Sequence, residues 1–216
     1  MIKGIIFDLD GTLLDTMKDI TTACNLTMKD YGFKTFSVKE ISLKVGNGNR
    51  KLVERCLPDD KLDLLDEAVD NFCMHYEKCY MDETIPFKGI KELLKELANR
   101  NIRISCNTNK FNQFCENLLK NKLPETTFFR IIGSRKDIPN KPDPYSANEI
   151  INALGVSKDE VLYVGDSDVD VKTGLNAGIK TVFVKWGSRT LEDIKDLSVD
   201  YIIDEPLDLL KIVDSL

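Results

Sequence analysis

The chain has 216 residues, enough for one medium-sized domain or for a core domain with a smaller insert. Hydrophobic residues make up 42% and charged residues 31% of the chain, which is typical of globular proteins and unlike disordered or fibrous ones. The formal net charge of -6 argues against nucleic acid binding through overall charge, and the apolar stretches are far shorter than the roughly 20 residues of a membrane span.

Short apolar runs alternate with amphipathic stretches along the chain. The runs occupy residues 4–7, 102–106, 128–132, 161–164, 181–184 and 201–203. Most are rich in β-branched or aromatic residues, which predicts strands covered on both faces, as in a parallel sheet. Apolar residues at helical spacing lie between them, for example at Ile90, Leu93, Leu94 and Leu97. This alternation predicts an α/β protein with a doubly wound, Rossmann-like parallel sheet.

Residues 16–82 break the alternation of strand and helix. One helical stripe joins Ile20, Cys24 and Tyr31, a second runs over residues 62–76, and no segment between them is typical of a strand. We therefore expect an all-helical cap at residues 16–82, inserted into an α/β core formed by residues 1–15 and 83–216. A segment joined to the core by two crossings beside the first strand is a natural lid.

Two carboxylates follow the first predicted strand. Asp8 and Asp10 are two residues apart, so along an extended chain both side chains can face the space beyond the end of the strand. Ligands of open α/β sheets bind there, and Gly11 would allow a tight turn and a close approach of a ligand to its backbone. Because neighbouring carboxylates repel each other, the pair requires a cation or a shared proton.

A second acidic segment, Asp166-Ser167-Asp168-Val169-Asp170, follows the predicted strand at residues 161–164. In a parallel sheet this strand ends at the same edge as the first one, so Asp166 adds a third carboxylate. Three carboxylates suit a hard cation, most plausibly Mg²⁺. We expect Asp170 to act behind the metal ligands, and Asp168 to be an ordinary first-turn residue of a helix.

Two further segments become informative in this context. Thr108 and Asn109 follow the predicted strand at residues 102–106, where a hydroxyl and the backbone N–H groups of a helix start would bind phosphate. Lys141 precedes a proline, which favours an extended backbone that can project its amino group into the site. With Asp8 and Asp10 these residues would supply a nucleophile, an acid/base group, a hydroxyl and a cation, the set needed for phosphoryl transfer through an aspartyl-phosphate.

The cysteines and the single histidine narrow the chemistry further. None of the six cysteines forms a CxxC pair, so we interpret them as reduced core residues of a cytoplasmic protein. The N-terminus meets Asp8 too early to be a secretory signal. His75 is the only imidazole, which excludes a His-rich zinc centre, and it lies in a largely apolar helical stretch where a packed or solvated role is expected.

Taken together, these segments resemble the motifs of the haloacid dehalogenase superfamily of Mg²⁺-dependent phosphatases. Asp8-Leu9-Asp10-Gly11-Thr12 resembles the first motif, Thr108 stands at the second, Lys141 at the third and residues 165–170 at the fourth. The predicted cap is similar to the one that a subgroup inserts directly after the first motif.

The resemblance implies a role for each matching residue. Asp8 would attack phosphorus, and Asp10 would protonate the leaving oxygen and then activate water. Thr108 and Lys141 would hold phosphate oxygens, with help from backbone N–H groups near Leu9, Asp10 and Asn109. Asp8, the backbone carbonyl of Asp10, and Asp166 would bind Mg²⁺, with Asp170 orienting this shell. An acid at the position of Asp10 favours a phosphatase or phosphomutase over a dehalogenase.

The predicted cap loop suggests a substrate class. Residues 44–52 resemble the glycine-bearing cap loop of phosphoglycolate phosphatases, so Gly46 and Asn47 would approach a small substrate and Arg50 or Lys51 would pair with its carboxylate. Alternatively, the loop is a plain helix–helix turn and Arg50 lies in solvent.

We therefore expect a phosphatase of a small phosphate monoester, first of all 2-phosphoglycolate. Hydrolysis of a sugar phosphate or pyrophosphate, or a phosphomutase activity like that of β-phosphoglucomutase, is the alternative, and a non-catalytic binding module is a remote one. The expected partner is a small phosphate ester, with neither nucleic acid nor membrane, and the protein would be a monomer or homodimer.

Overall fold

In the computed structural model, which describes all 216 residues, six parallel strands form one sheet in the order β5-β4-β1-β6-β7-β8. Their bounds are β1 Gly4–Phe7, β4 Arg103–Phe111, β5 Phe128–Ser134, β6 Val161–Gly165, β7 Lys180–Val184 and β8 Tyr201–Ile203. Each strand begins within one residue of a predicted apolar run. The predicted α/β class with a parallel sheet is therefore confirmed.

The order of the strands reverses at β1, near the middle of the sheet. From β1 the chain passes to β4 and β5 on one side, and it then returns to β6 and continues outward to β7 and β8 on the other. Such a switch point leaves a crevice beyond the carboxyl ends of the central strands. The fold thus places the ends of β1, β4 and β6 around one space.

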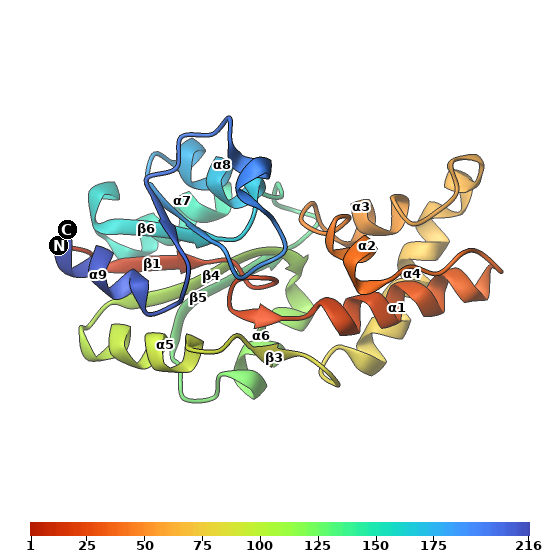
Figure 1. Cartoon of the computed structure of the whole chain (residues 1–216), viewed down its shortest axis with the longest axis horizontal. Helices are drawn as coiled ribbons and strands as arrows, with labels where there is room; N and C mark the ends of the chain where they lie inside the picture. The colour runs from red at the N-terminus through yellow and green to blue at the C-terminus, as the bar shows by residue number, and fades with distance from the viewer.

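Helices cover both faces of the sheet (Figure 1). α5 (Ile90–Asn99), α6 (Asn112–Lys122) and α9 (Asp208–Ser215) belong to one apolar cluster, and α7 (Tyr145–Leu154) with the end of α8 (Asp168–Ala177) belongs to a second. Side chains of β1 alternate between them: Ile5 and Phe7 join the first cluster and Ile6 joins the second. Burying each of these side chains contributes on the order of 1.5–3 kcal/mol to holding β1 in place.

The segment of residues 16–82 is helical and projects beyond the sheet, away from the two chain termini (Figure 1). Its elements are α1 Met17–Asp30, α2 Val38–Ser42, α3 Asn49–Glu54, the 3₁₀ helix Asp59–Leu64 and α4 Leu65–Cys79. Buried side chains of α1 and α4, among them Cys24, Phe72 and Tyr76, belong to the same apolar cluster as α5, α6 and α9. This segment is called the cap segment below. Short 3₁₀ helices also occur at Lys158–Glu160 and Leu191–Ile194.

Two short strands connect the cap segment to the sheet. β2 (Leu14–Asp15) and β3 (Ile85–Pro86) pair antiparallel, so the outgoing and returning chains lie side by side. The buried carboxylate of Asp19 accepts hydrogen bonds from the backbone N–H groups of Glu83 and Thr84 (both 2.9 Å) and from the Thr84 hydroxyl (2.7 Å). One side chain of α1 therefore fixes the returning chain at the junction. Across the whole structure, no helix combines the length and apolar character that crossing a membrane requires.

Candidate active site

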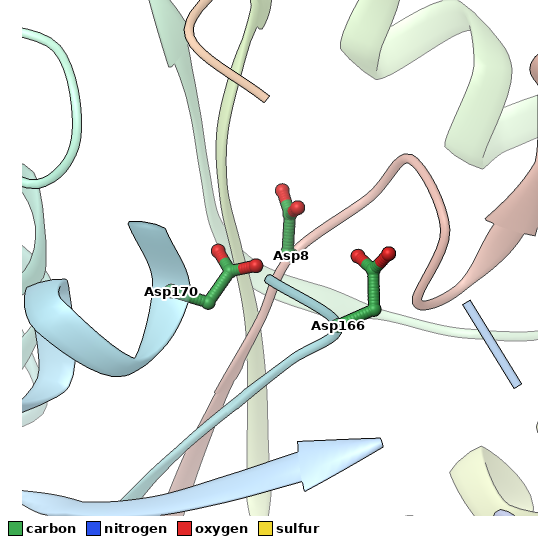
Figure 2. A group of neighbouring side chains, drawn as sticks. All are labelled: Asp8, Asp166 and Asp170. Carbon is green, nitrogen blue, oxygen red and sulfur yellow. The ribbon is translucent and has the colours of Figure 1, made fainter. Parts of the chain in front are cut away.

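Three buried carboxylates meet at the crevice beside β1. Asp8 follows β1, Asp166 follows β6 and Asp170 lies in the first turn of α8. One oxygen from each lies within 4.8 Å of the others. Figure 2 shows the three carboxyl groups extending to the same side of the strand ends. The structure thus brings together the predicted metal ligands Asp8 and Asp166 and the predicted supporting residue Asp170.

Asp166 is held in place by hydroxyl and backbone donors. Thr12 Oγ1 donates to Asp166 Oδ1 (3.2 Å), while the backbone N–H and the hydroxyl of Ser188 both donate to Oδ2 (2.7 Å each). Gly11 has a φ of +85°, and a Cβ built there would lie 2.4 Å from Asp166 Oδ2. Gly11 therefore permits the close packing of the loop after β1 against Asp166.

Lys141 joins the carboxylates through its amino group. Nζ lies 2.8 Å from Asp8 Oδ1 and 2.6 Å from Asp170 Oδ1, and the Lys141 side chain is only 3% exposed. The other oxygen of Asp170 accepts from the backbone N–H (3.1 Å) and the hydroxyl (2.5 Å) of Ser167 as part of a capping box of α8. The Asp170 side chain therefore caps the start of α8 and also aligns the Lys141 amino group.

The backbone of Lys141 is fixed by Asn109. The Asn109 amide accepts from the Lys141 N–H (2.9 Å) and donates to the Lys141 carbonyl (3.1 Å) and to the Gly46 carbonyl of the cap segment (3.0 Å). Its side chain thus connects the lysine loop and the cap segment.

The carboxylate cluster is electrostatically unfavourable without a cation. Burial, followed by the neighbouring charge of Asp170, raises the pKa of Asp8 to about 8. The same two causes raise the pKa of Asp166 to about 6, although the Ser188 and Thr12 donors oppose them. Asp8 Oδ1 is buried, and the Lys141 amino group forms an ion pair with it. Anionic oxygen ligands without a nearby histidine fit a hard divalent cation such as Mg²⁺.

Asp10 has different neighbours from Asp8. Both of its oxygens contact Lys110 Nζ (2.9 and 3.0 Å), and Oδ1 also accepts from the Thr16 hydroxyl (2.8 Å). Lys110 is buried, and its amino group lies 4.7 Å from the centre of the Tyr76 ring of α4. Burial alone would lower the pKa of Lys110, but the Asp10 carboxylate raises it above its ordinary value. The side chain of Asp10 thus stands apart from the carboxylate cluster.

Thr108 lines the same cavity but does not begin a helix. β4 continues in extended form to Phe111, with irregular pairing to β5 after Asn107, and α6 starts only at Asn112. The expected helix start directly behind Thr108 is therefore wrong, because the strand extends through this segment. The Thr108 hydroxyl accepts from the Lys110 N–H (3.3 Å) and is nearly buried at the cavity wall.

The cap segment covers part of the cavity, whose volume is about 30 Å³. The cap residues that line it are Ile20, Val45, Gly46, Gly48, Asn49 and Leu52. From the core, the Arg189 guanidinium donates to the carbonyls of Ser42 (2.8 Å) and Val45 (2.6 Å). A water molecule needs roughly 10–15 Å³, so the cavity has room for only a few water molecules.

Two predicted substrate residues of the cap segment lie outside this cavity, and so does Gly11, which follows β1. Arg50 pairs with Asp66 on the outer side of the cap segment and is 59% exposed, and Asn47 accepts from the Arg55 guanidinium (2.7 Å). The structure therefore brings Gly46 to the site but not Asn47 or Arg50. Asp168 also lies outside, paired with Lys172 in α8 (2.6 Å).

Sequence reasoning missed Lys110, Asn49 and Ser188, all of which line the cavity. Lys110 carried a usable signal, because residues 108 and 110 of one extended strand point to the same side. Ser188 follows the last residues of β7 at the same sheet edge as Asp166. Asn49 offered no signal of this kind, since its place depends on how the cap segment meets the core.

Comparisons with known proteins agree with this geometry. The family model described as haloacid dehalogenase-like hydrolase matches residues 5–184. The chain is 30% identical to a phosphoglycolate phosphatase of Aquifex aeolicus (99% of this chain, 97% of the relative) and 32% identical to the "Putative pyrophosphatase PpaX" of Clostridium perfringens (100% and 99%). A crystal structure titled "putative phosphoglycolate phosphatase" from Lactobacillus delbrueckii subsp. bulgaricus superposes with a TM-score of 0.90 at 26% identity, covering 98% of each chain.

Proposed function

Because the chain belongs to the haloacid dehalogenase-like hydrolases, we propose that it is a Mg²⁺-dependent phosphatase of small phosphate monoesters, first of all 2-phosphoglycolate. The observation that carries the proposal is that the two carboxylates that follow β1 have different neighbours. Asp8 lies in a buried acidic cluster beside Lys141, whereas Asp10 is bound to Lys110. This separation suits a nucleophile and an acid/base group in one site.

The proposed reaction has two displacement steps at phosphorus. A carboxylate oxygen of Asp8 forms a bond to phosphorus while the bond to the ester oxygen breaks, and Asp10 gives a proton to that leaving oxygen. Asp10 then takes a proton from water, whose oxygen attacks phosphorus and frees Asp8 and inorganic phosphate. The Lys141 amino group and the Thr108 hydroxyl would hold the phosphoryl oxygens during both steps.

The metal would be held by Asp8, Asp166 and the backbone carbonyl of Asp10, with Asp170 behind them. When bound, Mg²⁺ offsets the repulsion between the Asp8 carboxylate and the phosphate dianion. The residues of this chain supply the rest: Ser188 and Thr12 orient Asp166, and Asn109 orients Lys141.

We further propose that residues 16–82 act as a mobile cap over a core formed by residues 1–15 and 83–216. The pairing of β2 with β3 provides a narrow junction, and the Arg189 contacts to Ser42 and Val45 would form only when the cap is closed. Closure excludes water and so strengthens the charge interactions within the site.

Pyrophosphate is the second candidate substrate. The similarity to the Clostridium perfringens protein, named as a putative pyrophosphatase, extends over the whole chain at 32% identity. Pyrophosphate and 2-phosphoglycolate are both small and carry a second anionic group, so comparing the two substrates directly is necessary.

Phosphate release from 2-phosphoglycolate and pyrophosphate, with and without Mg²⁺, tests the proposal. We expect Mg²⁺-dependent release that Asp8→Asn abolishes while the circular dichroism spectrum is retained. Asp168→Asn is the matched control, because Asp168 lies in the same acidic segment but outside the cavity, paired with Lys172. Turnover by Asp8→Asn, with any ester, would rule out the covalent route.

A further inference from the structure

We propose that Lys110 and Asn49 form a subsite that binds a second anionic group of the substrate, next to the phosphoryl position. The inference rests on the proposed phosphatase function and narrows its substrates to phosphate compounds with a second anion close to the scissile bond. Lys110 comes from the core and Asn49 from the cap segment, so the subsite would be complete only when the cap segment is closed.

Lys110 is a buried cation of the cavity wall to which the proposed phosphoryl transfer assigns no contact with the substrate. Lys141 is engaged by Asp8 and Asp170, and the Arg189 guanidinium donates to carbonyls of the cap segment. An ammonium group carries three N–H donors. Two of the Lys110 donors are taken by the two Asp10 oxygens, so a ligand anion would compete for the third donor with the neighbouring Tyr76 side chain alone.

The surroundings of Lys110 also make it a fixed charge. Its side chain is 1% exposed, and the Tyr76 ring packs against its amino group. A desolvated, immobilised cation binds an anion more strongly than a surface lysine does, because neither water nor side-chain motion competes.

Asn49 supplies an independent indication of a ligand. It lines the cavity, and its side-chain Nδ2 is buried without any hydrogen-bond partner. A buried amide donor left unpaired is unfavourable, and a ligand oxygen would satisfy it. Arg50, the next residue, points away to Asp66, so the cap segment offers an amide to the cavity rather than a guanidinium.

The position of Lys110 fixes where the second anion must be. To protonate the leaving oxygen, Asp10 must come within roughly 2.6–3.2 Å of it. Lys110 Nζ lies within 3.0 Å of both Asp10 oxygens, so its remaining donor is close to the groups attached to that leaving oxygen. A carboxylate one methylene away, as in 2-phosphoglycolate, or the second phosphate of pyrophosphate, would lie in this region.

The test compares three substrates across matched variants. 2-Phosphoglycolate and pyrophosphate carry the second anion, and ethyl phosphate replaces it with a methyl group. For each protein, kcat/KM with each anionic substrate is divided by kcat/KM with ethyl phosphate, so that a general loss of catalysis cancels. The variants are Lys110→Met and Asn49→Ala, with Lys51→Met as control because Lys51 is on the outer surface of the cap segment, paired with Glu54.

We expect the ratio to fall about 100-fold in Lys110→Met and about tenfold in Asn49→Ala, and to stay at the wild-type value in Lys51→Met. A fall with 2-phosphoglycolate identifies the bound group as a carboxylate, and a fall with pyrophosphate alone identifies it as a phosphate. If the Lys110→Met variant does not fold, the ratio measured for Asn49→Ala alone tests the subsite. The corresponding ratio of dissociation constants is measured by calorimetry in variants that also carry Asp8→Asn, so that binding is read without turnover.

Two results would overturn the subsite. The first is an equal loss with all three substrates, because Lys110 would then serve only Asp10. The second is a ratio that depends on Arg50→Ala or Asn47→Ala and not on Lys110 and Asn49. By contrast, a wild-type protein that hydrolyses none of the three substrates with Mg²⁺ would contradict the proposed phosphatase function itself.

Discussion

Replacing Asp19 by alanine should destabilise the whole junction between the cap segment and the sheet. The Asp19 carboxylate is 1% exposed and accepts from the N–H groups of Glu83 and Thr84 and from the Thr84 hydroxyl. These donors belong to the chain just before β3, more than 60 residues away in sequence. The substitution therefore removes the acceptor that fixes the return of the chain to the core.

The magnitude follows from the number and kind of bonds lost. Hydrogen bonds to a charged acceptor contribute about 1.5–3 kcal/mol each, and unpaired buried N–H groups cost about 1–3 kcal/mol. Because Thr84 is completely buried and cannot turn to water, we expect a loss of about 3–5 kcal/mol in Asp19→Ala. Asp19→Asn retains one acceptor oxygen, so its loss should be smaller, at about 2–3 kcal/mol.

Urea unfolding measures these losses directly. Trp186, the single tryptophan, donates to the Thr12 carbonyl beside the junction, so its fluorescence reports on this region, while circular dichroism reports on all helices. Asp63→Asn is the control, because Asp63 is an exposed acidic residue of the same cap segment. Unfolding midpoints of Asp19→Ala that match those of Asp63→Asn in both probes would refute the assigned role of Asp19.

The remaining predictions concern chemistry and metal binding. Asp10→Asn should slow hydrolysis of 2-phosphoglycolate by about 10²–10⁴-fold but that of p-nitrophenyl phosphate far less, because p-nitrophenolate leaves without a proton; equal slowing in steady-state assays would contradict a general acid role. Metal-free protein should lose stability as the pH rises from about 4 to about 8. Folded Asp8 and Asp166, with pKa values near 8 and 6, retain protons that the unfolded chain has already released above 3.8. Since Mg²⁺ takes the place of these protons, its upward shift of Tm in thermal scans should be larger at pH 8 than at pH 6, and a pH-independent shift would argue against binding at this cluster.

The sheet and the acidic cluster were predictable because they depend on local sequence. Apolar runs of strand length mark the buried strands, and Asp8 and Asp166 directly follow two of them. Parallel strands end at one edge, so the meeting of these side chains follows from topology without knowledge of any contact. The same reasoning failed at Thr108, because the turn to α6 occurs four residues later than the change in residue type indicates.

The cap side of the cavity could not be predicted in this way. α3 starts at Asn49, and successive residues of a helix point about 100° apart. Asn49 and Arg50 therefore face different surroundings, one the cavity and the other Asp66. Which of the two faces the substrate depends on the packing of α3 against the core, a long-range property that the loop sequence alone does not encode. A positively charged residue next to a glycine-containing loop therefore does not by itself identify the residue that faces the substrate.

The environments of Asp8 and Asp10 show how one short segment can support opposite chemical demands. A nucleophile must be ionised when it meets phosphorus, whereas an acid/base group must exchange a proton with the leaving oxygen and therefore cannot be a metal ligand through its side chain. Asp8 and Asp10 are two residues apart, so both carboxylates lie at the end of β1, where the chain turns at Gly11. Contacts with residues from distant segments then direct the two side chains to different places. Asp8 faces Lys141 and the acidic cluster, and Asp10 faces Lys110 and Thr16. Because Lys110 also meets Tyr76 of α4, the position of the cap segment and the environment of Asp10 are physically linked.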